Sequence, residues 1–266
     1  MSTSDLDIDK NSIKLDNYYM KIIEKLKKMF VSFEDMIATE HACLSCDKEI
    51  LDGSAFQLCD KCLTELKKID GRVCLKCGEK LEGDKLKCDF CDDFDYAFDS
   101  NRSIFYYDEV SSKIVKSLKY GGRKYYAKHI AKMMTADRYV FDNVDIITYV
   151  PISSKRKRTR GFNQAEEIAR EISNLINIPV FELLDKVIDK KNQAKLSQKD
   201  RLENLKGTFA LNKDFEDKIK AKRILIVDDV FTTGATLSEC ASVIKHASPK
   251  GVKTLTFAKT KLNSIN

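Results

Sequence analysis

Eight of the nine cysteines in this 266-residue chain form four Cys-x-x-Cys pairs between residues 41 and 95. The pairs are Cys43 with Cys46, Cys59 with Cys62, Cys74 with Cys77, and Cys88 with Cys91. Four thiolates at this spacing can complete a tetrahedral shell around one zinc ion and leave no open position for a substrate water. The pairs therefore predict two zinc ions with structural roles.

The order of the pairs indicates which cysteines share an ion. Superimposing Cys43 on Cys74 and Cys59 on Cys88 gives an internal repeat of about thirty residues. The repeat favours sequential ligation, with two pairs on each ion, although a cross-braced arrangement stays open. Disulfides would require an exported protein, and the polar, acidic N-terminus lacks the features of a secretory signal. Catalytic thiol pairs usually occur singly beside a βαβ pattern, whereas the pairs here are tandem and regular, so zinc binding is favoured over catalysis. Cys240 stands apart and is expected to be a small buried residue of a helix.

A second constellation is the run at residues 223–236, RILIVDDVFTTGAT. Its apolar start is typical of a central parallel strand, and Asp228 and Asp229, the acid pair, follow at the sheet edge where ligands bind. The next residues, the phosphate loop, are small or hydroxylated and open a helix: Thr232, Thr233, Gly234, Ala235 and Thr236. Backbone N–H groups, hydroxyls and the positive end of a helix make a cradle for phosphate. A ribose 5-phosphate suits both parts, because its hydroxyls can bind the acids.

This run resembles the signature with which type I phosphoribosyltransferases bind phosphoribosyl pyrophosphate (PRPP): an apolar strand, two acids and a T-T-G-x-T loop. The resemblance implies that the acid pair holds the 2- and 3-hydroxyls of the ribose, that the phosphate loop holds the 5-phosphate, and that magnesium accompanies PRPP. It also implies a pyrophosphate loop after an earlier strand. Here a strand at residues 145–150 leads into a basic segment with Ser153, Ser154, Lys155, Arg156 and Arg160. These side chains suit pyrophosphate, although a solvated basic surface loop is the alternative.

Two further basic segments take their roles from their positions in that fold. Residues 189–201 correspond to the flexible hood that closes over PRPP, with Lys195 and Arg201 as candidate contacts. The turn KYGGR at residues 119–123 contributes Lys119 from the entry side of the domain. No residue stands out as a general base.

These residues need a scaffold, and the second part of the chain alternates strands with helices. Strands are expected at residues 103–107, 145–150, 180–183, 206–211, 223–227 and 252–258, and helices at 111–118, 125–138, 164–176 and 237–246. The alternation predicts an α/β fold with a largely parallel, helix-flanked sheet, here of the type I phosphoribosyltransferase kind. The expected organisation is an acidic tail (1–16), an amphipathic helix (17–40), a small double zinc-ribbon module with four cysteines per zinc ion (41–97) and a phosphoribosyltransferase domain (98–266). The helix could lie on a membrane surface, but packing on the rest of the protein is favoured.

The order of the motifs is similar to that of the ComF (ComFC) family of competence proteins. The shared features are the double zinc ribbon, L-K-Y-G-G, a V-P strand followed by R-G-F-N-Q-A, L-S-x-x-x-R-x-x-N-L-K-G-x-F, and V-D-D-V-x-T-T-G-A-T. They cover residues 17–260. The resemblance implies a cytoplasmic protein of natural transformation and DNA uptake, with single-stranded DNA and other competence proteins as candidate partners.

Two functions are consistent with these patterns. One is magnesium-dependent transfer of phosphoribosyl from PRPP to an unidentified acceptor, and the other is non-enzymatic binding of single-stranded DNA by the same phosphate-binding fold. Residues 1–100 hold 15 Lys and Arg against 22 Asp and Glu, whereas residues 101–266 hold 32 against 19. The basic second part suits ligands that carry phosphate.

Aromatic residues near basic ones could stack on DNA bases, but most of them are expected to be core. They are Phe105, Tyr106, Tyr107, Tyr120, Tyr125 and Tyr126. The chain has no run of about eighteen apolar residues, so no transmembrane segment is expected.

Overall fold

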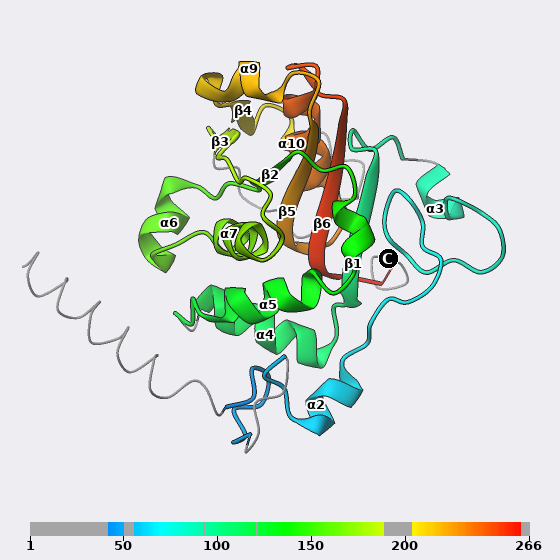
Figure 1. The fold of residues 1–266 in the computed structure, drawn as a ribbon, viewed down its shortest axis with the longest axis vertical. Helices are drawn as coiled ribbons and strands as arrows, with labels where there is room; N and C mark the ends of the chain where they lie inside the picture. The colour runs from blue at the N-terminus through cyan, green and yellow to red at the C-terminus, as the bar shows by residue number, and fades with distance from the viewer. Residues whose placement is uncertain (1–41, 51–55, 93, 121, 189–203, 262–266) are drawn as a thin grey trace, which may run out of the picture.

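The computed structural model describes residues 42–50, 56–92, 94–120, 122–188 and 204–261. At its centre is a four-stranded sheet in the order β1-β6-β5-β2, in which every strand pair is parallel (Figure 1). The strands are β1 (Ser100–Tyr106), β2 (Ile146–Tyr149), β5 (Arg223–Phe231) and β6 (Gly251–Lys259). The predicted parallel α/β sheet is confirmed. The expected tail at 1–16 and helix at 17–40 lie outside the described residues.

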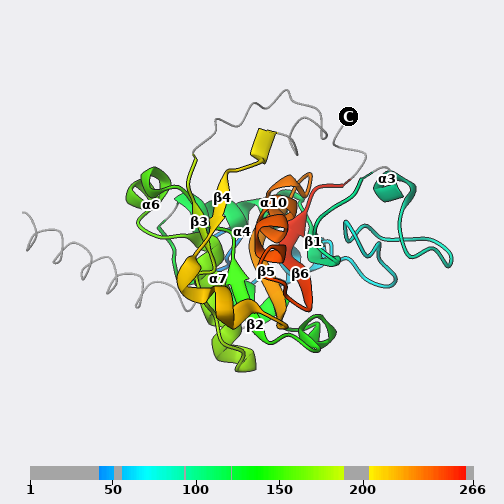
Figure 2. The same ribbon diagram turned by 90° about the horizontal axis from the view of Figure 1, so that it is seen from above.

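Apolar residues on both faces of β5 separate two cores. Leu225 and Val227 belong to one core, and Ile224 and Ile226 belong to the other, because successive side chains of a strand point to opposite faces. The first core is covered by helices α4 (Glu109–Tyr120), α5 (Tyr126–Met134) and α7 (Gln164–Ile176), and the second by α10 (Ala235–Lys245) (Figure 2). Cys240 is fully buried in the second core, as expected.

Shorter elements connect these layers. Strands β3 (Leu184–Lys186) and β4 (Phe209–Leu211) form a separate antiparallel pair that packs near α10. The remaining elements are α2 (Asp60–Glu65), α3 (Asp89–Asp92), α6 (Ser154–Arg160), α9 (Glu216–Ile219) and the 3-10 turns η1 (Arg138–Phe141) and η2 (Lys213–Phe215). None of the described helices has the length and apolar character that crossing a membrane requires.

Two expectations about the path of the chain are wrong. The strand expected at 180–183 begins instead at Leu184, because its partner is β4, and Val180 makes only an isolated bridge to Ile147. The basic segment after β2, expected to be a loop, forms helix α6. The Ser153 side chain accepts a hydrogen bond from the Arg156 backbone N–H at its start, and Gly161, with a φ of +83°, ends it in the left-handed conformation.

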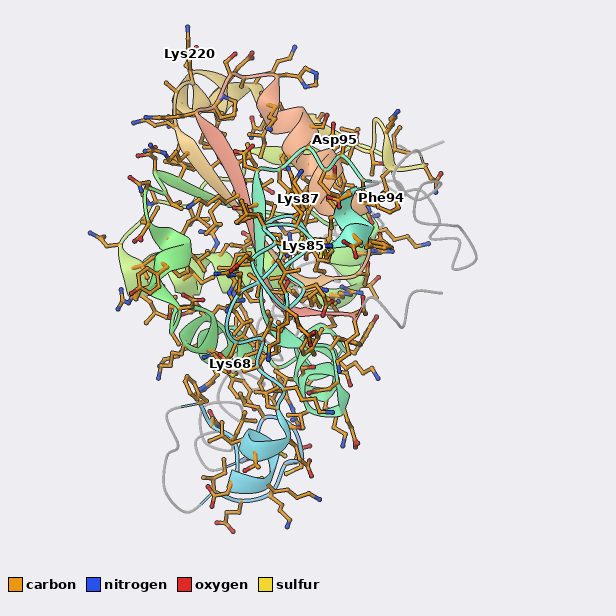
Figure 3. The ribbon with its side chains drawn as sticks, turned by 90° about the vertical axis from the view of Figure 1, so that its right-hand side faces the viewer. Lys68, Lys85, Lys87, Phe94, Asp95 and Lys220 are labelled. Atoms are coloured by element: carbon orange, nitrogen blue, oxygen red, sulfur yellow. The ribbon has the colours of Figure 1, made fainter. Side chains whose placement is uncertain are left out.

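The zinc-ribbon repeats pack at different places on the sheet domain. The first ribbon (Cys43 to Cys62) leads into α2 and lies beyond α4 and α5, at the bottom of Figure 1, and its Cys43, Leu44 and Cys62 belong to the first core. The second ribbon (Cys74 to Cys91) contains α3 and lies beside β1, where it shares the second core. Figure 3 labels Lys85 and Lys87 on the second ribbon, Phe94 and Asp95 on the segment that follows it, and Lys68 on the linker from the first ribbon.

Candidate functional site

The acid pair lies in the last part of β5, beyond the end of its neighbour β2. Tyr149, the last residue of β2, pairs with Val227, whereas β6 continues to pair with Asp228 and with residues further along. The sequence had suggested that the acids follow the strand. They lie inside it instead, because β6 holds the chain extended as far as Phe231. They still lie at the carboxyl end of a parallel sheet, which is the edge where such sheets bind ligands.

Lys119, at the end of α4, is bound to Asp229. Its Nζ lies 2.9 Å from Oδ1 and 2.8 Å from Oδ2 of the carboxylate, and both side chains are largely buried. Burial acts to lower the pKa of Lys119, but the negative charge of Asp229 outweighs it and raises this pKa overall. Lys119 therefore stays charged and neutralises Asp229.

The other member of the acid pair has no such neutralising contact among the described residues. Burial, followed by the nearby charge of Asp229, raises the pKa of the Asp228 carboxyl to about 7. The two acids therefore differ in their surroundings. The Asp229 side chain is bound to Lys119, whereas Asp228 is close to the midpoint of its titration near neutral pH and can gain or lose a proton when a ligand binds.

Arg160 brings the basic segment towards the acid pair. Its positive charge is close enough to act on the pKa of Lys119, and its Nη1 donates a 2.9 Å hydrogen bond to Oε1 of Gln164. Its guanidinium also lies over the ring of Tyr120, 5.1 Å from the centroid. Lys119 and Arg160 thus present two cations beside the acids, from α4 and α6.

The other candidate pyrophosphate contacts are placed less centrally. Ser153 is buried and caps α6, Arg156 is half-buried, and Ser154 and Lys155 are exposed on the same helix. Ser153 is therefore committed at least in part to a structural hydrogen bond. The hood contacts Lys195 and Arg201 lie outside the described residues.

The phosphate loop turns sharply from β5 into α10. Thr232 is exposed, Thr233 and Ala235 are buried, and Thr236 is half-buried. Gly234 has a φ of +76°, and a Cβ placed there would lie 2.6 Å from Cζ of Phe231. Only glycine suits this position, and the first turn of α10 follows it directly, so helix N–H groups face the end of the loop.

The eight ribbon cysteines form two separate clusters. The sulfurs of Cys43, Cys46, Cys59 and Cys62 lie within 4.8 Å of one another, and so do those of Cys74, Cys77, Cys88 and Cys91. Sequential grouping is thus correct, and the cross-braced alternative is excluded. Each cluster also receives a backbone N–H at 3.4 Å, from Cys59 to the Cys43 sulfur and from Cys88 to the Cys74 sulfur. Four thiols so arranged fit one zinc ion per cluster.

Comparison with known proteins finds two domain families and several relatives. Residues 37–93 match the double zinc ribbon domain family, and residues 158–263 match the phosphoribosyl transferase domain family. Competence protein F of Haemophilus influenzae is 26% identical over 76% of this chain and 90% of its own length. Competence protein ComFC of Streptococcus pneumoniae is 29% identical over 60% of this chain and 68% of its own. The resemblance to the ComF family is confirmed.

Other relatives and solved structures extend the comparison. The DNA utilization protein YhgH of Escherichia coli K12 is 24% identical over 76% of this chain and 90% of its own. The glutamine PRPP amidotransferase of B. subtilis shares 19% identity over 49% of this chain and 25% of its own, with a TM-score of 0.33. A hypoxanthine phosphoribosyltransferase of Staphylococcus aureus gives the same TM-score at 14% identity, over 53% and 66% of the two chains. The phosphoribosyl transferase match includes Arg160, the acid pair and the phosphate loop, and it begins after Ser153, Ser154, Lys155 and Arg156.

Some residues around this site were not expected from the sequence. Tyr107 follows β1, and burial raises the pKa of its phenol, which also responds to the charges of Lys119 and Asp229. Gln164 was visible only as part of the R-G-F-N-Q-A motif, and its buried Nε2 has no partner among the described residues. Tyr96 carries no motif, yet its hydroxyl donates a 2.9 Å hydrogen bond to the backbone oxygen of Thr233.

Proposed function

We propose that this ComF relative binds PRPP with magnesium and transfers its phosphoribosyl group to an acceptor during the handling of DNA. The observation that carries the proposal is the meeting of three kinds of group at one edge of the parallel sheet. Asp228 and Asp229 can accept the ribose hydroxyls, the phosphate loop offers helix N–H groups to a phosphate, and Lys119 and Arg160 offer cations to a leaving group. Each group matches a different part of PRPP.

The proposed reaction breaks the bond between C1 of the ribose and the pyrophosphate oxygen, and the bonding electrons leave with pyrophosphate. A lone pair of the acceptor then forms the new bond to C1, and an acceptor atom that carries a proton releases it to water. The protein contributes mainly by positioning and by stabilising the charge that develops on the leaving group. Lys119 can serve this role while bound to Asp229, since an ammonium group has three donors.

Magnesium fits the donor set of this site. Mg²⁺ favours oxygen ligands and is commonly bound by one or two carboxylates together with substrate phosphates. Bound with PRPP, it would supply positive charge to the departing pyrophosphate. The chain itself contributes the acid pair and Lys119 to the binding of PRPP. Lys119 already offsets the charge of Asp229, so Asp228 is the acid whose ionisation can change when the ligand binds.

The test is calorimetric titration of the full chain with PRPP and magnesium. Replacing both acids (Asp228→Asn with Asp229→Asn) is expected to abolish binding, whereas Asp217→Asn, which changes an exposed acid on α9, is expected to leave it intact. Unchanged affinity in the double variant would refute the assignment. Pyrophosphate release in the presence of a panel of bases and amines then tests transfer itself.

A second candidate function is binding of single-stranded DNA without catalysis. Among the six aromatic residues considered from the sequence, Tyr120 is the exposed one, at 73% of its surface, and Arg160 lies against its ring. Phe105 and Tyr126 are core residues instead. If DNA is bound here, its affinity must fall steeply with salt and must decrease in Tyr120→Ala. A flat salt response would exclude this function.

A further inference from the structure

The connecting segment (residues 94–99), which joins the second ribbon to β1, touches the phosphate loop directly. Tyr96 is 2% exposed, and its hydroxyl donates to the backbone oxygen of Thr233. Its ring also packs closely against Gly234, since a Cβ on Gly234 would lie 2.8 Å from Cε1 of Tyr96. One side chain of the ribbon region therefore contacts two successive residues of the loop.

The hydrogen bond fixes the orientation of the peptide group between Thr233 and Gly234. This peptide is planar and trans, so its C=O and N–H point in opposite directions. With the oxygen directed at the buried Tyr96 hydroxyl, the N–H of Gly234 is directed away from Tyr96. An N–H held in this way is a preorganised donor for an anion at the start of α10.

The second ribbon in turn holds the connecting segment. Lys76, between the zinc ligands Cys74 and Cys77, donates from Nζ to the backbone oxygen of Phe98 at 2.6 Å and to that of Tyr96 at 3.3 Å. The ring of Phe98 stacks on Tyr96 with 5.0 Å between centroids. The position of Tyr96 therefore depends on a hairpin that the second zinc cluster closes.

We propose that Tyr96 is a positioning residue for the phosphate loop, held in place by the second ribbon, and that it sets the affinity of the loop for the phosphate of a ribose 5-phosphate group. This inference rests on the proposed function for the identity of the ligand. Tyr96 itself is too deeply buried to touch that ligand, and it acts through the Thr233 peptide.

The experiment compares Tyr96→Phe with Tyr106→Phe in the full chain. Both variants lose one hydroxyl at the junction with the second ribbon, because the Tyr106 hydroxyl donates to Glu79 at 2.7 Å and not to the loop. Amide hydrogen exchange at residues 232–236 is expected to be about tenfold faster in Tyr96→Phe and unchanged in Tyr106→Phe. Affinity for ribose 5-phosphate is expected to be about tenfold lower in Tyr96→Phe alone.

The two readouts separate the inference from the proposed function. Unchanged exchange in Tyr96→Phe, or equal acceleration in both variants, overturns the positioning role whatever the ligand does. Faster exchange with unchanged affinity also overturns it, because the position of the loop would not matter for the phosphate. A third outcome is faster exchange in Tyr96→Phe alone, together with a wild-type chain that binds neither ribose 5-phosphate nor PRPP. The exchange result would then support the positioning of the loop, and the absence of binding would refute the proposed function.

Discussion

The two zinc ribbons have the same local geometry but different relations to the rest of the molecule. In the first, the Cys43 N–H donates to the Lys48 oxygen at 2.7 Å, and in the second, the Cys74 N–H donates to the Glu79 oxygen at 2.7 Å. In each ribbon, the residue directly after the first cysteine pair has a positive φ: Asp47 in the first and Gly78 in the second. The repeat seen in the sequence is therefore a repeat of structure.

The surroundings of the two ribbons differ in polarity and depth. Asp47 of the first ribbon forms an ion pair with Arg123 on the surface, whereas Glu79 of the second forms one with Lys259, which is fully buried in β6. Gly78 also fits closely against β1, since a Cβ there would lie 3.0 Å from Nδ2 of Asn101. Two equal cysteine clusters can thus contribute unequally to stability, because the contribution depends on what each hairpin buries.

The strongest test of this comparison removes one ligand from each cluster at matched positions. Cys88→Ser is expected to lower the melting temperature by about 10 °C, because the second ribbon fits closely against β1 at Gly78 and its Glu79 pairs with the buried Lys259. Cys59→Ser is expected to lower it by less than half as much. Zinc analysis should return one ion from each variant, and only Cys88→Ser should weaken ribose 5-phosphate binding. Equal losses in the two variants would contradict the comparison.

The ion pairs provide the next test. Glu79→Gln leaves the buried ammonium of Lys259 without a charged partner, and we expect a loss of about 3 kcal/mol in the free energy of unfolding. Asp47→Asn breaks a surface pair and is expected to cost less than about 1 kcal/mol. Urea denaturation at neutral pH measures both. A cost for Asp47→Asn that matches that of Glu79→Gln would show that the two ribbons are anchored alike.

The pH dependence of ligand binding sharpens the comparison, because the second ribbon should act on loop position and not on the ionisation of the acids. Asp228, with its raised pKa, is mostly protonated below about pH 7 and mostly ionised above it. Ribose hydroxyls need an ionised acceptor, so affinity should rise about tenfold from pH 6 to pH 8.

Variants separate the two effects. Asp228→Asn should remove the part of this rise that comes from ionisation of Asp228. Any pH dependence left in that variant reports the titration of the ligand's own phosphate. Tyr96→Phe should lower affinity by the same factor at every pH, since its hydroxyl acts on the Thr233 peptide. A changed midpoint in Tyr96→Phe would mean that the ribbon also influences the acid pair. Titration calorimetry in matched buffers provides the measurement.

The parts of this molecule that follow from local sequence were predictable. The apolar period of residues 164–176 gave α7 its bounds, the alternating faces of β5 gave a central strand, and the cysteine spacing gave two clusters. Helix α6 was missed because it has no apolar stripe, although Ser153 and Gly161 are ordinary start and stop signals. Its composition pointed to a loop, and capping decided the outcome.

The parts that depend on distant contacts were not predictable. Tyr96 and Thr233 are 137 residues apart, and no sequence pattern at either residue predicts their contact. The same holds for Lys119 and Asp229, which are 110 residues apart and meet only because α4 ends beside the edge of β5. The sequence therefore identified the acid pair and the loop as chemical groups, while their partners were found only in the folded chain.

The smallest expected effect concerns a second hydrogen bond between the connecting segment and the start of α10. The Ala97 N–H donates to Oγ of Ser238 on α10 at 3.0 Å, so Ser238→Ala removes an acceptor and leaves the Tyr96 bond in place. We expect about threefold weaker binding of ribose 5-phosphate, because one partly buried hydrogen bond contributes about 1 kcal/mol or less. Since both bonds hold the same segment against the same loop, Tyr96→Phe combined with Ser238→Ala should weaken binding by less than the product of the separate effects. Multiplicative losses would mean that the two contacts act independently and that the segment does not move as one unit with the second ribbon.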